Sequence, residues 1–165
     1  MSSVKLIREI VTKNGIVNII GPPGSGKTKL SEFLAQNLKK NILHLDIFLF
    51  DEKCNRKDNG AKLINEFLKN KNSLIIDGTY VSCLNEERID KTDHFIMLDV
   101  SFMTCVFRIF KRTLNFQRKK HCAEKLNLRL IKFLLTYRLY KCSEIVAKIP
   151  KNKLTIINHK YEFFT

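Results

Sequence analysis

The chain has 165 residues, of which 44% are hydrophobic, and a formal net charge of +14. This length and apolar content exclude a disordered protein and predict one domain over residues 1–165 with a sizeable core. The sequence has no run of 18 apolar residues and no secretory leader, so we expect a cytoplasmic protein without a membrane partner. Five cysteines without a C-x-x-C pair fit a reducing compartment.

The positive charge lies mainly in the C-terminal part of the chain. Residues 101–165 hold 15 Lys and Arg against 3 Asp and Glu, a net charge of +12, whereas residues 1–100 hold 15 against 13, a net charge of +2. A basic segment of this kind suits either a phosphate-rich small substrate or nucleic acid. The small substrate is favoured, because the segment lacks the aromatic pattern of a dedicated nucleic-acid module.

Hydrophobic periodicity predicts strands that alternate with helices. The predicted elements are, in chain order, helix 4–13, strand 16–20, helix 27–39, strand 41–46, helix 61–69, strand 73–77, strand 94–99, helix 102–114, helix 126–147 and strand 153–158. Continuous apolar strands between helices imply a parallel sheet that is covered on both faces. The predicted fold class is therefore α/β, a three-layer sandwich with a five-stranded parallel sheet.

Residues 21–28 read GPPGSGKT, a complete G-x-x-x-x-G-K-[ST] phosphate-binding loop between a predicted strand and a predicted helix. In this motif Lys27 reaches the β- and γ-phosphates, and the hydroxyl of Thr28 is a ligand of Mg²⁺. The sequence therefore predicts ATP and Mg²⁺ as cofactors. The residues expected to contact the nucleotide here are Gly21, Pro22, Pro23, Gly24, Ser25, Gly26, Lys27 and Thr28.

Three predicted strands end in an aspartate, at the sheet edge where ligands of α/β proteins bind. Asp77 is the expected metal ligand beside the loop, because Gly78 lets the chain turn away from a ligand. Asp99 is a weaker candidate, since it can cap the next helix. Asp46 is the predicted catalytic carboxylate, which holds or deprotonates an acceptor hydroxyl. His44 stands alone in the sequence and is expected to be structural or exposed.

A cluster of arginines is the other candidate for phosphate chemistry. Arg108 and Arg112 lie four residues apart on one helical face, and Arg118 follows in a basic break. The planar guanidinium suits phosphate oxygens and the charge of a transition state. We expect Arg108 and Arg112 to bind the nucleotide, and Arg112, Arg118 and Lys27 to act in catalysis. A solvated run of charge is the alternative.

Further segments carry a resemblance to a known family. With the loop, LHLD at 43–46, IIDGTY at 75–80 and CAEKL at 122–126 are together similar to the DNA topology-modulation protein family. The likeness covers about residues 16–158 and implies an adenylate-kinase-like P-loop fold. The chain departs from the family after the LHLD segment, where FLFDEK stands in place of the usual Trp and Pro-Gly.

The wider resemblance to adenylate and shikimate kinases implies two functional regions, a short lid at about 115–125 and an acceptor-binding region at about 47–72. The sequence thus predicts a P-loop kinase of the nucleoside or small-molecule type, which moves the γ-phosphoryl group of Mg·ATP to an unidentified hydroxyl or phosphate acceptor. Two alternatives stay open. One is a nucleotide-regulated nucleic-acid-binding protein that uses the basic C-terminal half, and the other is an ATPase without an acceptor.

Overall fold

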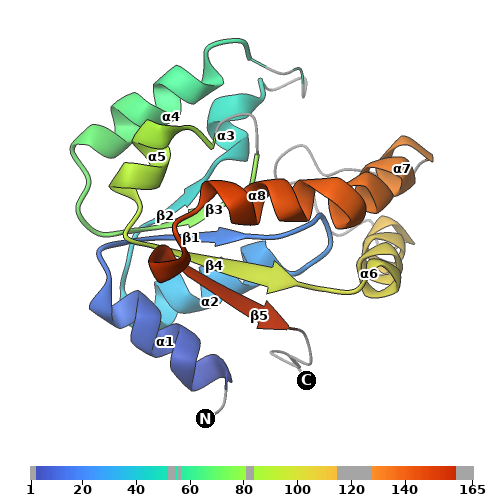
Figure 1. The fold of residues 1–165 in the computed structure, drawn as a ribbon, viewed down its shortest axis with the longest axis horizontal. Helices are drawn as coiled ribbons and strands as arrows, with labels where there is room; N and C mark the ends of the chain where they lie inside the picture. The colour runs from blue at the N-terminus through green and yellow to red at the C-terminus, as the bar shows by residue number, and fades with distance from the viewer. Residues whose placement is uncertain (1–2, 52–54, 56, 81–83, 115–127, 159–165) are drawn as a thin grey trace.

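A computed structural model describes residues 3–51, 55, 57–80, 84–114 and 128–158. The described strands form one sheet with the order β2-β3-β1-β4-β5, and each pair of neighbouring strands is parallel. Figure 1 shows this sheet at the centre, with helices on both of its sides. The predicted five-stranded α/β sandwich is therefore confirmed.

The observed elements follow the predicted order. The strands are β1 (Ile16–Ile20), β2 (Ile42–His44), β3 (Leu74–Asp77), β4 (His94–Asp99) and β5 (Leu154–Asn158). The helices and helical turns are α1 (Ser3–Lys13), α2 (Lys27–Leu38), α3 (Asp46–Leu49), α4 (Gly60–Lys69), α5 (Glu86–Lys91), α6 (Phe102–Leu114), α7 (Leu128–Thr136), the π-helical turn η2 (Tyr137–Lys141), α8 (Cys142–Lys148) and the 3₁₀ turn η3 (Lys151–Lys153). Helices α3 and α5 were not predicted, because neither reaches two full turns and so neither shows a periodic pattern.

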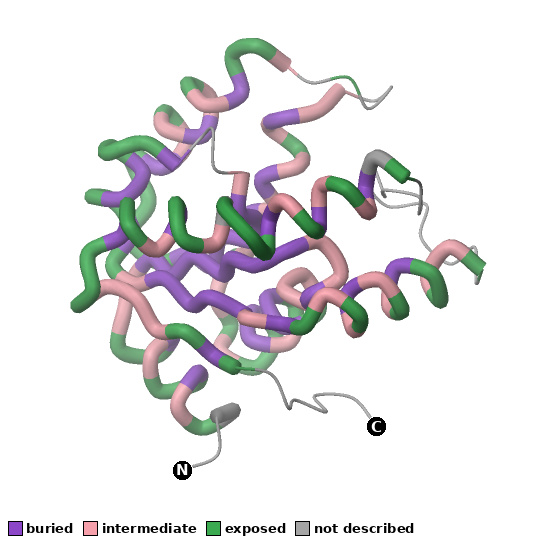
Figure 2. Tube along the Cα trace, turned by 45° about the vertical axis from the view of Figure 1, so that its right-hand side comes forward, coloured by how far each residue is buried: buried purple, intermediate pink, exposed green. Residues whose placement is uncertain are grey.

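The sheet is buried on both faces, which explains its nearly continuous apolar strands. Along β1, Val17 and Ile19 pack into the cluster that includes residues of α1 and α2. Ile16 and Ile20 point the other way, Ile16 into a cluster with α4 and Ile20 into one with α5 and α8. Figure 2 shows the buried strands running between these helical layers. The layers fix the carboxyl ends of the strands, where the candidate site lies.

Within the helix predicted over 126–147, the described residues form a continuous helical run that contains a π-helical turn. The described part begins with α7, passes through η2 and ends with α8 at Lys148. The turn inserts an extra residue into the helical repeat and buries Tyr137, which is 4% exposed. Such turns recur at functional sites. Among the described residues, no helix is long and apolar enough to cross a membrane.

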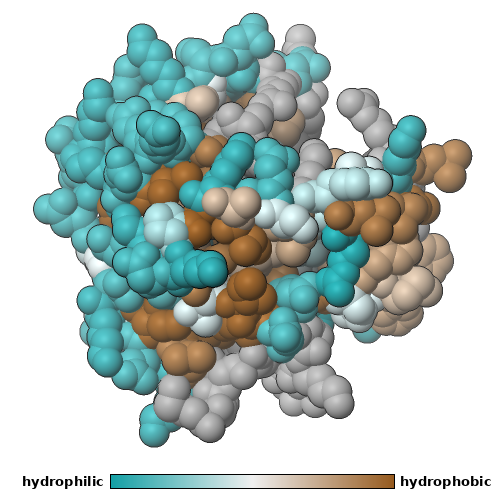
Figure 3. All heavy atoms as spheres, viewed as in Figure 1, coloured by the Kyte–Doolittle hydropathy of each residue, from teal (hydrophilic) through white to brown (hydrophobic). Residues whose placement is uncertain are grey.

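Helix α6 has apolar side chains on two faces. Cys105 and Ile109 are buried against the sheet. The outward side carries exposed apolar side chains at a spacing of three and four residues, and Figure 3 shows an apolar surface at this end of the molecule. They are Met103, Phe107, Phe110 and Leu114. These four side chains therefore add little to the stability of the core.

Candidate active site

The phosphate-binding loop lies between β1 and α2, as its motif requires. Gly24 and Gly26 have φ angles of 79° and 91°, which lie in the left-handed region that glycine tolerates best. A Cβ atom at Gly24 would come within 2.7 Å of the carbonyl oxygen of Cys105. The close approach of the loop to α6 thus depends on glycine at this position.

Two cations contact the loop itself. The Nζ atom of Lys27 donates a hydrogen bond of 3.4 Å to the carbonyl oxygen of Pro22, so the side chain folds back over the loop. From α6, Nη1 of Arg108 donates to the carbonyl oxygen of Ser25 at 3.1 Å. Arg108 therefore reaches the loop, where the sequence placed a nucleotide-binding residue. It enters from an element more than 80 positions away in the chain.

Of the other residues predicted for phosphate or metal binding, Thr28 and Arg112 are described and Arg118 is not. Thr28 lies in the first turn of α2 and is half-buried. Arg112 is half-buried on α6, one turn beyond Arg108. Arg118 and the predicted lid at 115–125 lie outside the described residues. Their proposed roles stay predictions.

Asp77 is buried at the end of β3 and is paired with His44. The two residues lie opposite each other on neighbouring parallel strands, and Nδ1 of His44 is 2.9 Å from Oδ2 of Asp77. This hydrogen bond is the main cause of the raised pKa of His44. The second oxygen, Oδ1 of Asp77, is buried without a hydrogen-bond partner among the described residues. Asp77 is thus held by one oxygen, while the other can accept a ligand.

The prediction that His44 is structural or exposed did not include its hydrogen bond to Asp77, the predicted metal ligand. Asp46 and Glu32 also raise the pKa of His44 by their negative charge. The sequence carried one signal, the placement of His44 two residues before Asp46 at a strand end. The decisive fact is that β2 pairs with β3, and a single sequence does not state which strands are neighbours.

Asp46 lies beyond the end of β2, not in it as predicted. The strand ends at His44, and Asp46 is the first residue of α3. Its Oδ1 atom accepts a hydrogen bond of 2.5 Å from the hydroxyl of Tyr80, which follows β3 by three residues. Asp46 and Asp77 therefore lie at the carboxyl ends of adjacent strands, both close to His44.

Thr79 joins the turn after β3 to the loop. Its hydroxyl accepts a hydrogen bond of 2.9 Å from the backbone N–H of Gly21 and donates one of 2.8 Å to the carbonyl oxygen of the same residue. Both residues are buried. Sequence reasoning missed this contact, because a threonine after a strand has no distinctive pattern.

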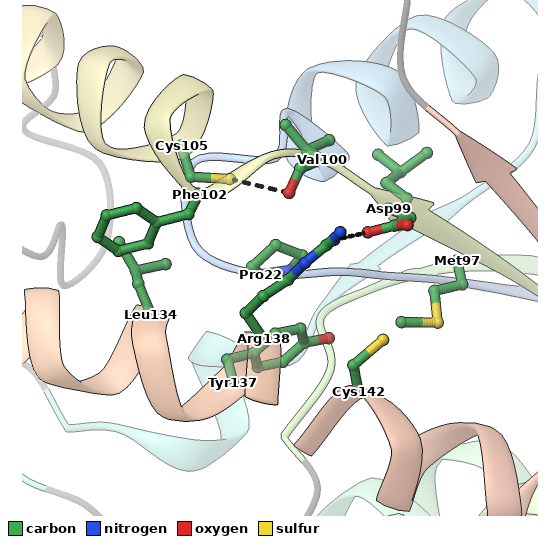
Figure 4. Close-up of a pocket in the computed structure, with 11 residues that line it drawn as sticks. Pro22, Met97, Asp99, Val100, Phe102, Cys105, Leu134, Tyr137, Arg138 and Cys142 are labelled. Atoms are coloured by element: carbon green, nitrogen blue, oxygen red, sulfur yellow. Dashed lines mark hydrogen bonds and ion pairs between the residues drawn. The ribbon is translucent and has the colours of Figure 1, made fainter. Parts of the chain in front are cut away.

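Asp99, the last residue of β4, pairs with Arg138 from η2. The two residues line a pocket at the end of β4, together with Pro22 of the loop and the buried side chains of Tyr137 and Cys105 (Figure 4). Burial raises the pKa of Cys105 to about 11, so this thiol is protonated at neutral pH. The role of Asp99 at the metal stays a prediction.

A family model described as Nephrocystin 3, N-terminal matches residues 3–122, which are 120 of the 165 residues. The chain belongs to this family. The description names no reaction, so the chemistry of the site has to be argued from its residues. No curated protein matches the sequence.

Solved structures of small kinases share the fold of this Nephrocystin 3 N-terminal family member. Shikimate kinase from Acinetobacter baumannii in complex with shikimate is 14% identical with a TM-score of 0.62, over 93% of this chain and 88% of that chain. A putative fructose transport system kinase from Silicibacter is 18% identical with a TM-score of 0.60, over 94% and 98%. A gluconokinase from Sinorhizobium meliloti is 14% identical with a TM-score of 0.57, over 90% and 84%.

At these identities the likeness shows the fold alone. The predicted shikimate-kinase-like architecture is thereby confirmed at the level of the fold. None of these matches carries the name of the DNA topology-modulation family, so that finer resemblance stays a prediction from sequence.

Proposed function

We propose that this protein is a P-loop phosphotransferase that moves the γ-phosphoryl group of Mg·ATP to a small hydroxyl or phosphate acceptor. The observation that carries the proposal is the combination of a complete phosphate loop with two carboxylates at the adjacent strand ends, Asp46 and Asp77. Phosphoryl transfer needs positioning and charge neutralisation, which loop, cations and carboxylates supply. The kinases that share the fold support the proposal.

The residues present fit a magnesium ion. Asp77 offers the buried oxygen Oδ1, which lacks a hydrogen-bond partner among the described residues, and Thr28 offers a hydroxyl at the start of α2. No cluster of three or more His, Cys, Asp or Glu side chains suited to a metal occurs within the described ranges. Mg²⁺ binds through one or two protein oxygens and the phosphates of a nucleotide, and Asp77 and Thr28 offer oxygens of that kind. Bound there, Mg²⁺ would neutralise phosphate charge.

In this proposal, one set of residues binds ATP and another binds the acceptor. The backbone of residues 21–26 would hold the phosphates. The side chain of Lys27 would leave the carbonyl oxygen of Pro22 and contact the phosphates. Arg108 would keep the loop packed against α6. Asp46 would orient the acceptor hydroxyl and receive its proton. Arg112 and Arg118 would stabilise the transferred group, in agreement with the sequence prediction.

The proposal is tested by the nucleotide affinity of Lys27→Ala, measured by isothermal titration with Mg·ATP. We expect Lys27→Ala to abolish tight binding, because the phosphates lose the cation of the loop. Lys29→Ala is the matched control, since it removes a positive charge from the same helical turn but lies outside the motif. Equal affinities of the wild type and Lys27→Ala would overturn the proposed function.

A further inference from the structure

Tyr80 has an unusual backbone conformation for an aromatic residue. Its φ angle is 38°, and among the described residues Lys39 is the other non-glycine residue with a positive φ. Lys39 caps the C-terminus of α2, where a left-handed residue is common. Tyr80 follows a strand and has no such explanation. A strained backbone of this kind is unfavourable and persists only where the surroundings impose it.

A buried arginine holds the turn that precedes Tyr80. Arg88 of α5 is 0% exposed, and its guanidinium donates to the carbonyl oxygens of Thr79 and Gly78, each at 3.1 Å. It also donates to Oδ1 of Asn18 at 2.5 Å. Asn18, buried on β1, in turn donates to Gly78 at 3.1 Å and to Ile76 at 3.0 Å. The backbone of this turn is thus fixed by side chains from two other elements.

Burial of a guanidinium group has a substantial desolvation cost, so apolar residues would fill this part of the core at least as well. What an apolar side chain does not provide is a planar fork that binds two consecutive carbonyl oxygens. The arrangement at Arg88 therefore specifies a backbone geometry in addition to filling space.

The fixed turn contacts both the phosphate loop and the Asp46 carboxylate. The Thr79 side chain is bonded to Gly21, the first residue of the phosphate loop. The next residue, Tyr80, donates its hydroxyl to Asp46 at 2.5 Å, and its ring lies 5.9 Å from that of Phe50. One turn therefore sets the loop and the Asp46 carboxylate relative to each other.

We propose that Tyr80 is the positioning residue of Asp46, and that Arg88 holds the turn that makes this possible. The inference rests on the proposed phosphotransferase function, in which Asp46 orients the acceptor. Tyr80 acts through Asp46 and does not touch the nucleotide. Loss of its hydroxyl should therefore leave binding of Mg·ATP intact and slow the transfer step. Loss of the Arg88 fork should affect both, because it loosens Thr79 as well as Tyr80.

The first experiment uses Tyr80→Phe, which keeps the ring and removes the hydroxyl. Because the acceptor is unidentified, the probe is Mg·ATP alone, with affinity measured by titration and ADP formation measured in single turnovers with water as the acceptor. We expect an affinity within about two-fold of the wild type and ADP formation slower by about ten-fold or more. Tyr140→Phe is the control, since Tyr140 is exposed on η2.

A double-mutant cycle separates positioning from a general structural effect. In the Asp46→Asn background, Tyr80→Phe should have no further effect on ADP formation, because the group it positions has been changed. Additive losses in the cycle, or an unchanged rate in Tyr80→Phe, would overturn the role of Tyr80. Failure of the wild type to bind Mg·ATP would instead overturn the proposed function, and this inference with it.

The second experiment uses Arg88→Lys, which keeps the charge but not the fork. With folding verified by circular dichroism, we expect weaker binding of Mg·ATP and slower formation of ADP in the same protein. A folded Arg88→Lys variant that matches the wild type in both measurements would overturn the role of Arg88. If Arg88→Lys does not fold, Asn18→Asp takes its place. This variant keeps an acceptor for Arg88 but loses the amide N–H groups that hold Gly78 and Ile76. Weaker Mg·ATP binding with slower ADP formation would support the role of the turn, and wild-type values of both would overturn it.

Discussion

Thr79→Val should lower the free energy of unfolding, because it removes the two hydrogen bonds between Thr79 and Gly21. The Thr79 hydroxyl pairs with both backbone groups of Gly21, at 2.9 and 2.8 Å. Valine has nearly the same shape, so the cavity stays filled while the N–H and the carbonyl oxygen of Gly21 both lose a buried partner. An unpaired buried group costs about 1–3 kcal/mol, so for the two groups we expect a loss of roughly 2–6 kcal/mol in the free energy of unfolding.

The assay is urea unfolding, with the midpoint and the slope fitted together. Thr79→Ser is the matched control. It keeps the hydroxyl and removes one methyl group, so its loss should be near 1 kcal/mol. Mg·ATP affinity should also fall in the valine variant, because Gly21 begins the loop. A valine variant within about 0.5 kcal/mol of the wild type would refute the reasoning that this hydroxyl satisfies Gly21.

Further predictions concern packing, pH and thiol chemistry. On α6, Ile109→Ala should cost about 2–5 kcal/mol in urea unfolding, while Phe107→Ala should cost less than about 0.5 kcal/mol, because Ile109 is 1% exposed and Phe107 64%. Burial lowers the pKa of His94 below the usual 6.5. The free energy of unfolding should therefore fall as the pH drops below 6.5, where the unfolded chain binds a proton more readily than the folded protein. The urea midpoint should depend less on pH in His94→Gln. The hydrogen bond to Asp77 raises the pKa of His44. The contribution of this bond to the free energy of unfolding is therefore complete below pH 6.5 and disappears as the pH rises through the folded-state pKa of His44. The variant His44→Gln should not show this pH dependence. Cys105, with its pKa raised to about 11, should react with a thiol reagent at pH 8 no faster than the protein opens, as mass spectrometry of labelled peptides would report.

The phosphate loop could be predicted from sequence because every part of it is local. Its glycines, Lys27 and Thr28 occur within eight residues, and the strand and helix on either side show their own periodicity. The five strands were predicted for a similar reason, since each is a short apolar run. These local predictions agreed with the structure except at the end of β2, where Asp46 begins α3, and at the short helix α5, which has no periodic pattern.

Contacts across the sheet could not be predicted in this way. The pairing of His44 with Asp77 depends on which strands are adjacent, and the bond between Tyr80 and Asp46 joins two segments 34 residues apart. Arg88 follows Glu86 and Glu87, so its local sequence is that of a solvated helical surface, yet it is fully buried. Tertiary packing overrode the local pattern at the positions that hold the site together.

The basic C-terminal half separates the proposed phosphotransferase from the nucleic-acid-binding alternative. Part of its charge is used within the fold. Lys153 donates to the carbonyl oxygens of Ile89, Asp90 and Thr92, at 3.0–3.3 Å, and so connects the end of α5 with η3, the turn directly before β5. Arg138 pairs with Asp99. The net charge of residues 101–165 therefore overstates the charge that can meet a polynucleotide.

A salt titration of duplex-DNA affinity distinguishes the two functions. A surface that neutralises several phosphates loses affinity with a log–log slope near −0.9 per phosphate. We expect wild-type affinity for DNA at physiological salt to be weaker than about 1 μM, in the range of non-specific binding. The triple variant Lys111→Gln, Lys132→Gln and Lys151→Gln removes three exposed charges outside the loop. It should leave Mg·ATP binding and ADP formation unchanged, whereas Asp46→Asn should slow ADP formation. Two results together would favour the nucleic-acid alternative. The first is sub-micromolar DNA binding that the triple variant abolishes. The second is an unchanged rate of ADP formation in Asp46→Asn, because the carboxylate at the acceptor side would then have no role in the reaction.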